Sequence, residues 1–180
     1  MPSLSDIPHI VSASQIPNFN DGMAWDPPQT PDELVKPYEA NIAAWEAGTG
    51  YAFTAEDKTN GEFIGRIAMR RITGDDGGWN LGFWTHPTHQ RQGYMTECVR
   101  AILALIFCQL NAQYVEACHA LWNAPSERVI AKAGFRYVGT VSDRFMKHGK
   151  WVEEKAHRMT RNEWLNVVKT QDGIEQRAGE

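Results

Sequence analysis

A glycine between an extended run and a long apolar helix gives this chain a candidate anion-binding site. Gly93 follows the extended run 79–85 and precedes segment 94–110, where apolar residues recur at three- and four-residue spacing. A glycine lets backbone N–H groups approach an anion, and a helix N-terminus adds the positive end of its dipole. The spacing therefore predicts a phosphate site, although a glycine that only makes a turn would give the same pattern. The predicted buried stripe comprises Tyr94, Cys98, Ala101, Ile102, Leu105, Ile106 and Leu110.

A second segment, 121–137, favours the phosphate interpretation. Its pattern of Asn-x-x-Ser, an apolar residue and Lys-x-Gly-Phe is carried by Asn123, Ser126, Val129, Lys132, Gly134 and Phe135. Upstream, Gln90, Gly93 and Met95 occupy the marked positions of a Gln/Arg-x-x-Gly-x-Gly/Ala loop, from which Met95 departs. Together the two motifs resemble the GNAT N-acetyltransferase superfamily. The phrases at 25–28, 82–84 and 160–164 are similar to its ribosomal-protein N-terminal acetyltransferase subgroup, and the resemblance covers roughly residues 21 to 168.

The resemblance implies acetyl-CoA as co-substrate and assigns its contacts. The implied pyrophosphate loop comprises Gln90, Arg91, Gln92, Gly93, Tyr94, Met95 and Thr96. Asn123, Ser126 and Lys132 are further implied contacts. Backbone N–H groups at Phe83 and Trp84 would stabilise the oxyanion, where one well-placed donor contributes about 3 kcal/mol. No metal is implied. Arg91 could equally be a solvated surface charge.

Three residues bear on the proton-transfer steps: Asn80, His86 and Ser126. The resembled subgroup often carries Glu where this chain has Asn80, and an amide cannot act as a base. His86, at the end of the same strand, is the substitute by side-chain chemistry, because its ordinary pKa lies near neutrality. Ser126 is implied as the donor to the departing thiolate, while Ser126 and Asn123 could instead only cap their helix. The histidine could also be purely structural.

Composition agrees with one cytoplasmic domain over 1–180. The 180 residues carry a formal net charge of -4 without long charge runs, which argues against nucleic acid as partner. No apolar run is long enough to predict a membrane span, and the N-terminus does not read as a signal peptide. Three cysteines, Cys98, Cys108 and Cys118, lack metal-ligand spacing and fit reduced thiols.

Element order predicts an α+β, GNAT-like single domain, with a mixed, mostly antiparallel central sheet flanked by helices. Residues 1–20 are expected to be irregular, with at most a short strand at 10–13, and 170–180 to be a frayed tail. A helix is predicted over 31–48 and antiparallel strands over 51–55, 63–70 and 79–85. After the helix at 94–110, the expected elements are a strand at 114–118, a helix at 124–132 ended by Gly134, strands at 135–140 and 151–159, and a helix at 163–168.

The predicted function is acyl-CoA-dependent N-acylation of a primary amine, by direct attack in a ternary complex. The acceptor stays open between a protein N-terminus and a small-molecule amine, because the subgroup's first strand phrase is absent near residues 9 to 20. Numerous aromatic side chains could wall an acceptor cleft or serve core and homodimer packing. Asn80 and Met95 also motivate an alternative, a non-catalytic acyl-CoA-binding regulatory module.

Overall fold

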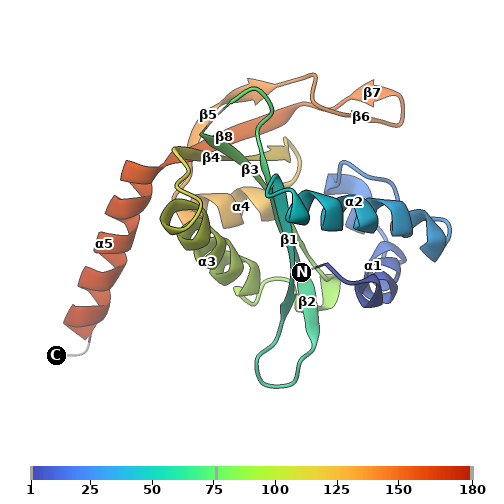
Figure 1. Ribbon diagram of the computed structural model, residues 1–180, viewed down its shortest axis with the longest axis horizontal. Helices are drawn as coiled ribbons and strands as arrows, with labels where there is room; N and C mark the ends of the chain where they lie inside the picture. The colour runs from blue at the N-terminus through green and yellow to red at the C-terminus, as the bar shows by residue number, and fades with distance from the viewer. Residues whose placement is uncertain (1, 76, 179–180) are drawn as a thin grey trace.

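A six-stranded sheet forms the centre of the protein, in the order β1-β2-β3-β4-β8-β5 (Figure 1). The computed structural model describes residues 2–75 and 77–178. Only the β3–β4 pair is parallel within this sheet. The α+β prediction with a mostly antiparallel sheet is therefore confirmed. The strands are β1 (Gly50–Glu56), β2 (Phe63–Arg71), β3 (Gly78–Thr85), β4 (Tyr114–Ala120), β5 (Arg136–Val141) and β8 (Glu154–Thr160), with a separate hairpin of β6 (Met146–Lys147) and β7 (Lys150–Trp151).

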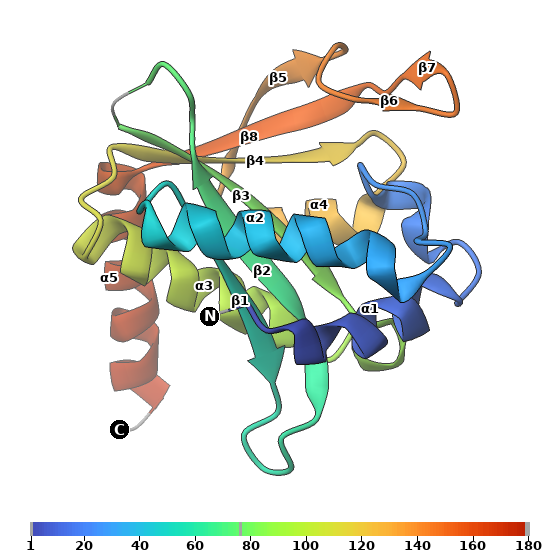
Figure 2. The same cartoon turned by 45° about the vertical axis from the view of Figure 1, so that its right-hand side comes forward.

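Helices cover both faces of the sheet (Figure 2). On one face lie α1 (Ile7–Ser14) and α2 (Val35–Glu46); on the other lie α3 (Tyr94–Cys108) and α4 (Ala124–Ala133). Gly134 ends α4 in the left-handed conformation, with φ of +93°, as the sequence predicts. Within the described residues, no helix is both long enough and apolar enough to cross a bilayer.

The buried face of α3 differs from the predicted stripe by one position. The buried residues are Met95, Val99, Ile102, Leu103, Ile106 and Phe107. They pack against the sheet beside Val115 and Ala117, whereas Ala101 is exposed. Apolar residues occupy most positions of this helix, so two adjacent stripes fit its spacing equally well. Packing against the sheet selects one of them.

Two terminal predictions need correction. The N-terminal segment is not irregular, and no strand forms at 10–13, because α1 spans Ile7–Ser14. Pro8 sits in the first turn, where a missing N–H costs nothing, and Ile7 and Ile10 pack on Tyr38 of α2. At the other end, α5 runs Arg161–Ala178, beyond the predicted 163–168 and through most of the segment expected to fray.

An opening between β3 and β4 is the feature that positions the site. Their parallel pairing begins at Gly78 with Tyr114 and ends at Leu81 with Ala117. Both strands then continue, to Thr85 and Ala120, without further pairing to each other. Backbone groups of residues 82–85 on the β4 side therefore have no ladder partner in β4.

Candidate active site

Two clefts meet at the opening between β3 and β4. The first, here the α3 cleft, has a volume of about 530 Å³ and is lined by the loop before α3, the start of α4 and the end of β3. The second, here the α2 cleft, has a volume of about 480 Å³ and lies on the other face, lined by α2, β1, β2, β3, β4 and β8. Their shared residues are Gly22, Met23, Phe83, Trp84, Asn123 and Ser126. A ligand in one cleft can therefore touch a ligand in the other.

The loop before α3 has the backbone shape of an anion site. Arg91 and Gly93 both adopt left-handed conformations, with φ of +64° and +91°, and Gly93 is the N-cap of α3. No side chain caps this end of the helix, so its first-turn N–H groups are open to an anion. A Cβ on Gly93 would meet no protein atom within 4 Å, so the space over the glycine is empty.

Basic side chains surround this anion site. Arg91, Arg128 and Lys132 all line the α3 cleft, and Asp21 is the one carboxylate among its lining residues. Such a cation cluster at an open helix N-terminus suits a ligand that carries several phosphates. Met95, which departs from the Gly/Ala pattern, is 4% exposed and packs in the core under α3 while its edge lines the cleft.

The start of α4 forms the opposite wall. The Asn123 side chain accepts a hydrogen bond from the Ser126 backbone N–H at 3.2 Å, so Asn123 does cap its helix. Its Nδ2 donates to the Gly22 carbonyl at 3.4 Å, which holds the 20–23 segment against α4. Ser126 lines both clefts, so it lies where the two clefts meet.

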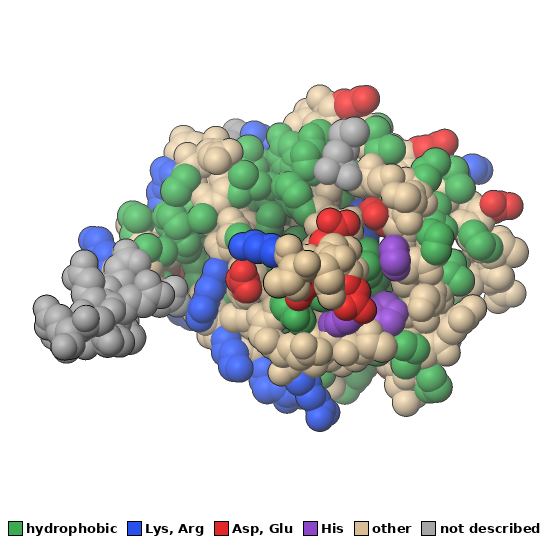
Figure 3. Space-filling model, turned by 90° about the horizontal axis from the view of Figure 1, so that it is seen from below, with side chains coloured by type: hydrophobic (Ala, Val, Ile, Leu, Met, Phe, Trp, Pro, Cys, Tyr) green, Lys and Arg blue, Asp and Glu red, His purple; other side chains and the backbone are tan. Residues whose placement is uncertain are grey.

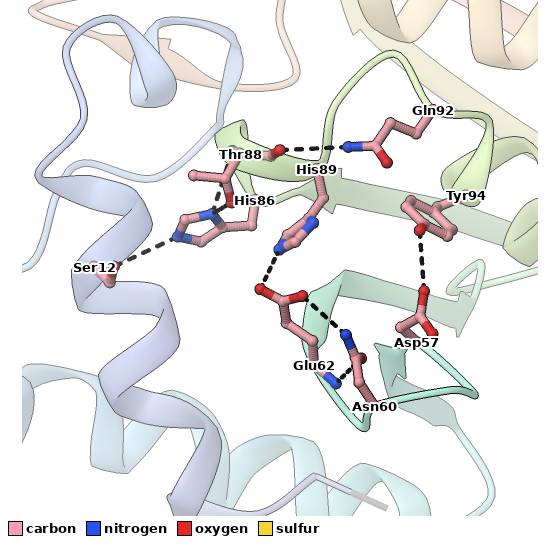
Figure 4. Close-up of polar contacts among 9 residues, drawn as sticks. All are labelled: Ser12, Asp57, Asn60, Glu62, His86, Thr88, His89, Gln92 and Tyr94. Atoms are coloured by element: carbon pink, nitrogen blue, oxygen red, sulfur yellow. Dashed lines mark hydrogen bonds and ion pairs between the residues drawn. The ribbon is translucent and has the colours of Figure 1, made fainter.

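His86 lies outside both clefts. Its Nε2 is 3.5 Å from Ser12 Oγ on α1, and its Nδ1 is 2.7 Å from Thr88 Oγ1 (Figure 4). Burial and the neighbouring His89 and His9 lower the pKa of His86. The ring therefore ties α1 to the end of β3, and the structure does not bring it to the reacting position that its side-chain chemistry suggested.

The β1–β2 hairpin contacts the loop that precedes α3. His89 Nε2 is 3.3 Å from Glu62, and Tyr94 donates a hydrogen bond to Asp57 at 3.0 Å. Figure 3 shows the histidine side chains of this face lying beside carboxylates. Both contacts join hairpin carboxylates to residues that flank Gly93, so the hairpin helps to fix the loop geometry.

The α2 cleft has a floor of small residues and a polar rim. Ala52, Ala68 and Gly82 form one row across β1, β2 and β3, because Ala52 pairs with Ala68 and Ala68 with Gly82. Trp25 and Trp84 line its apolar part. The polar lining residues are Asn41, Arg66, Asn80, Cys118, His119, Asn123, Ser126, Arg144 and Glu154.

Glu154 is the one carboxylate among the lining residues of this cleft, and no ion pair among the described residues includes it. It is partly buried, and burial raises its pKa while the positive charge of Arg144 lowers it. Arg144 itself pairs with Glu116 at 3.4 Å, and Arg158 pairs with the same carboxylate at 2.6 Å. Glu154 stands opposite Ala120 in the β4–β8 ladder, so it shares the cleft face with Cys118 and Glu116. His119 also borders the cleft, but its side chain alternates to the other face of the sheet, where its ring stacks on His157.

Most predicted site residues come together. All the predicted cofactor contacts line the α3 cleft except Gln92, which donates to the Thr88 carbonyl instead. Asn80 and Ser126 line the α2 cleft, and His86 lines neither. Arg128, Arg66 and Glu154 were missed; Arg128 had a sequence signal, since it lies two residues after Ser126 in the recognised motif. No cluster of three or more metal-ligating side chains occurs in the part of the chain that the structure describes.

A family comparison decides how these clefts are to be interpreted. The model described as Acetyltransferase (GNAT) domain matches residues 2–136. The chain belongs to the GNAT acetyltransferase family. This GNAT chain is 30% identical over 101 residues to the "Uncharacterized N-acetyltransferase YnaD" of Bacillus subtilis, covering 56% of the chain and 59% of that protein. A second Bacillus subtilis relative, "Probable N-acetyltransferase YjcK", is 31% identical over 75 residues, covering 42% of the chain and 41% of that protein. The alignments thus span well under two thirds of these relatives.

Solved structures share the fold of this GNAT chain. A spermidine N-acetyltransferase from Vibrio cholerae, in complex with CoA and spermine, superposes with a TM-score of 0.75 at 20% identity, covering 89% of this chain and 93% of that chain. RimL, a ribosomal L7/L12 alpha-N-protein acetyltransferase in complex with CoA, gives 0.77 at 15% identity, covering 88% and 90%. At such identities the likeness shows the fold, and the neighbours include ribosomal-protein acetyltransferases as the resembled subgroup suggests.

Proposed function

We propose that the protein transfers an acetyl group from acetyl-CoA to a primary amine, where the α3 and α2 clefts meet. The observation that carries this proposal is the β3–β4 opening, through which two clefts of different chemistry share Phe83, Trp84, Asn123 and Ser126. A two-substrate reaction needs two binding sites with one common point. The family membership makes acyl transfer the reaction class to test there.

The α3 cleft fits the phosphates of acetyl-CoA. Open N–H groups at the start of α3 suit a pyrophosphate, and Arg91, Arg128 and Lys132 add positive charge around it. Two of the solved neighbours are complexes with CoA, which supports the same ligand here.

In the proposed reaction the amine nitrogen attacks the thioester carbonyl carbon. A C–N bond forms, the C–S bond breaks, and the CoA thiolate leaves. Unpaired backbone N–H groups of β3 beyond Leu81 are the proposed donors to the developing oxyanion. Ser126, at the junction of both clefts, is the proposed hydrogen-bond donor to the departing sulfur.

Glu154 replaces His86 as the proposed proton acceptor. It lines the α2 cleft, makes no ion pair within the described residues, and its raised pKa increases its affinity for a proton. Asn80 lies in the same cleft, where its amide can orient the acceptor amine but cannot accept the proton. The proton lost by the amine would therefore reside on Glu154 when the amide product forms.

A transfer assay with free-thiol detection tests this function. The protein is incubated with acetyl-CoA and a panel of amines comprising amino acids, polyamines and N-terminal peptides. The expected result is amine-dependent CoA release, with initial-rate patterns of a ternary complex rather than ping-pong. Firm CoA binding by calorimetry without thiol release from any amine would instead support the non-catalytic binding module that Asn80 and Met95 first suggested.

A further inference from the structure

Arg66 is a buried cation that makes no ion pair within the described residues. It is 8% exposed, and its guanidinium carbon lies 4.4 Å from the centre of the Tyr38 ring. None of the ion pairs found among the described residues includes it. Asp6, a second buried charge near Tyr38, accepts a hydrogen bond from Thr54 at 2.7 Å rather than pairing with Arg66. A buried guanidinium that makes no direct ion pair gains stability when a ligand supplies an anionic group.

The Arg66 side chain contacts Tyr38 and also lines the α2 cleft, so a ligand in the cleft can reach it. On β2, Arg66 lies two positions before Ala68 of the small-residue row, so the two side chains share one face of the sheet. Arg66 pairs in register with Trp84, which lies at the β3–β4 opening. A Cβ on Gly82 would meet nothing within 4 Å, so the floor between Arg66 and the opening is free. A ligand whose amine lies at the opening can therefore place a second group against Arg66.

The cleft thus offers one unpaired charge of each sign. Arg144 shares the Glu116 carboxylate with Arg158, so Arg66 and Glu154 are the Arg and Glu of the lining that make no ion pair within the described residues. A planar guanidinium binds a carboxylate through two parallel hydrogen bonds, while a carboxylate favours an ammonium group before it is deprotonated. A volume of about 480 Å³ is in the range of small-molecule pockets.

Resting on the proposed transferase function, we propose that the acceptor is a small amine that also carries a carboxylate, as amino acids do. Arg66 binds the acceptor carboxylate, and Glu154 faces its amine. Polyamines carry no anionic group and leave Arg66 unpaired in the bound state. The inference therefore separates this chain from an acceptor class named for one of its structural neighbours.

Matched acceptors test the charge requirement directly. Each amino acid is compared with its carboxamide and with the amine that lacks the carboxyl group, by kcat/KM at fixed acetyl-CoA. We expect the free acid to be preferred by ~100-fold, because the site rejects an analogue that leaves a buried polar group unpaired. Equal values for acid and carboxamide, or a preference for polyamines, would overturn the proposal while leaving the transferase function intact.

The variants Arg66→Gln and Arg66→Lys test whether Arg66 causes the preference for the free acid. Arg66→Gln should lower kcat/KM ~100-fold for the acid and leave the carboxamide within ~3-fold, whereas Arg66→Lys should retain part of the preference. Arg71→Gln is the matched control, since Arg71 lies on the same strand over the Trp79 ring but lines neither cleft. An equal loss for both acceptors would overturn the role of Arg66. If Arg66→Gln does not fold, the wild-type panel still decides.

Calorimetry with amino acids and CoA-loaded protein keeps the two proposals apart. Saturable binding that Arg66→Gln abolishes, without transfer to any amine, would retain the carboxylate site and refute the transferase function. Transfer that does not depend on the acceptor carboxylate would retain the transferase function and refute the carboxylate site. Neither binding nor transfer would refute both.

Discussion

The α3 and α2 clefts differ in how the chain builds them. The α3 cleft draws on three segments, 16–23, 83–96 and 122–132, and much of its expected ligand contact comes from backbone at a helix N-terminus. The α2 cleft draws its charged and polar residues from α2, α4, β2, β3, β4, β8 and adjoining loops, and its chemistry resides in side chains. A backbone site keeps its ligand under most substitutions, while a side-chain site changes ligand with one. The first cleft therefore suits an invariant co-substrate and the second an acceptor that varies among relatives.

The largest expected effect is on the α3 cleft. Gly93→Val places a branched side chain where φ is +91° and where the pyrophosphate would lie, so acetyl-CoA binding should weaken on the order of 100-fold or more. Calorimetry measures the Kd. Gly74→Val is the matched control, because Gly74 has φ of +78°, equally empty surroundings and a place outside both clefts. Similar losses in both variants would attribute the effect to backbone strain alone.

Glu154→Gln tests the chemistry of the α2 cleft. Loss of the proton acceptor should lower kcat on the order of 100-fold and leave the Kd of acetyl-CoA unchanged. The ascending limb of the pH–rate profile should also lose the Glu154 ionisation. His86→Gln removes a titratable group that lines neither cleft, and should change the rate by at most ~3-fold. The opposite ranking of the two variants would restore His86 as the base.

Gly82→Val should impair acceptor binding without impairing acetyl-CoA binding, and its effect should be smaller than that of Glu154→Gln. Gly82 lines the α2 cleft only, and its added side chain would occupy the open floor. The KM of the acceptor should rise ~10-fold, with the Kd of acetyl-CoA unchanged, because the substitution removes acceptor volume without touching the α3 loop. A parallel loss of acetyl-CoA binding would mean that the clefts do not act separately.

The smallest effect concerns stability and pH. Burial lowers the pKa of His86 and of His157, where the stacked His119 adds to the shift. The unfolded chain therefore binds more protons, and the free energy of unfolding should fall as pH drops from above 6.5 through the lowered folded pKa values. The raised pKa of Glu154 has the opposite effect: as pH falls through the pKa of Glu154 in the folded protein, this residue increases the free energy of unfolding. Urea unfolding at pH 7.5, 6.5 and 5.5 measures the slope, and His157→Gln should flatten it. An unchanged slope would contradict the assignment.

The sequence alone determined the elements that a local pattern can specify. The β1–β2–β3 meander, the long helix after Gly93 and the α4 termination at Gly134 follow from alternation, helical spacing and turn residues. The two walls of the α3 cleft at 83–96 and 122–132 were predictable for the same reason, since each is a continuous segment, whereas the wall at 16–23 was not predicted. The Pro, Ser and Asn content misled the prediction of 1–20, because a proline such as Pro8 suits an irregular segment and a first helical turn equally well.

Only the tertiary structure decided the rest. Which stripe of α3 is buried depended on the surface of the sheet beneath it, and the place of His86 depended on the packing of α1. Arg66 and Glu154 lie 88 positions apart in the numbering, so no local spacing relates them. They line one cleft because β3 and β4 separate after Leu81, and that separation depends on how the whole sheet twists and pairs.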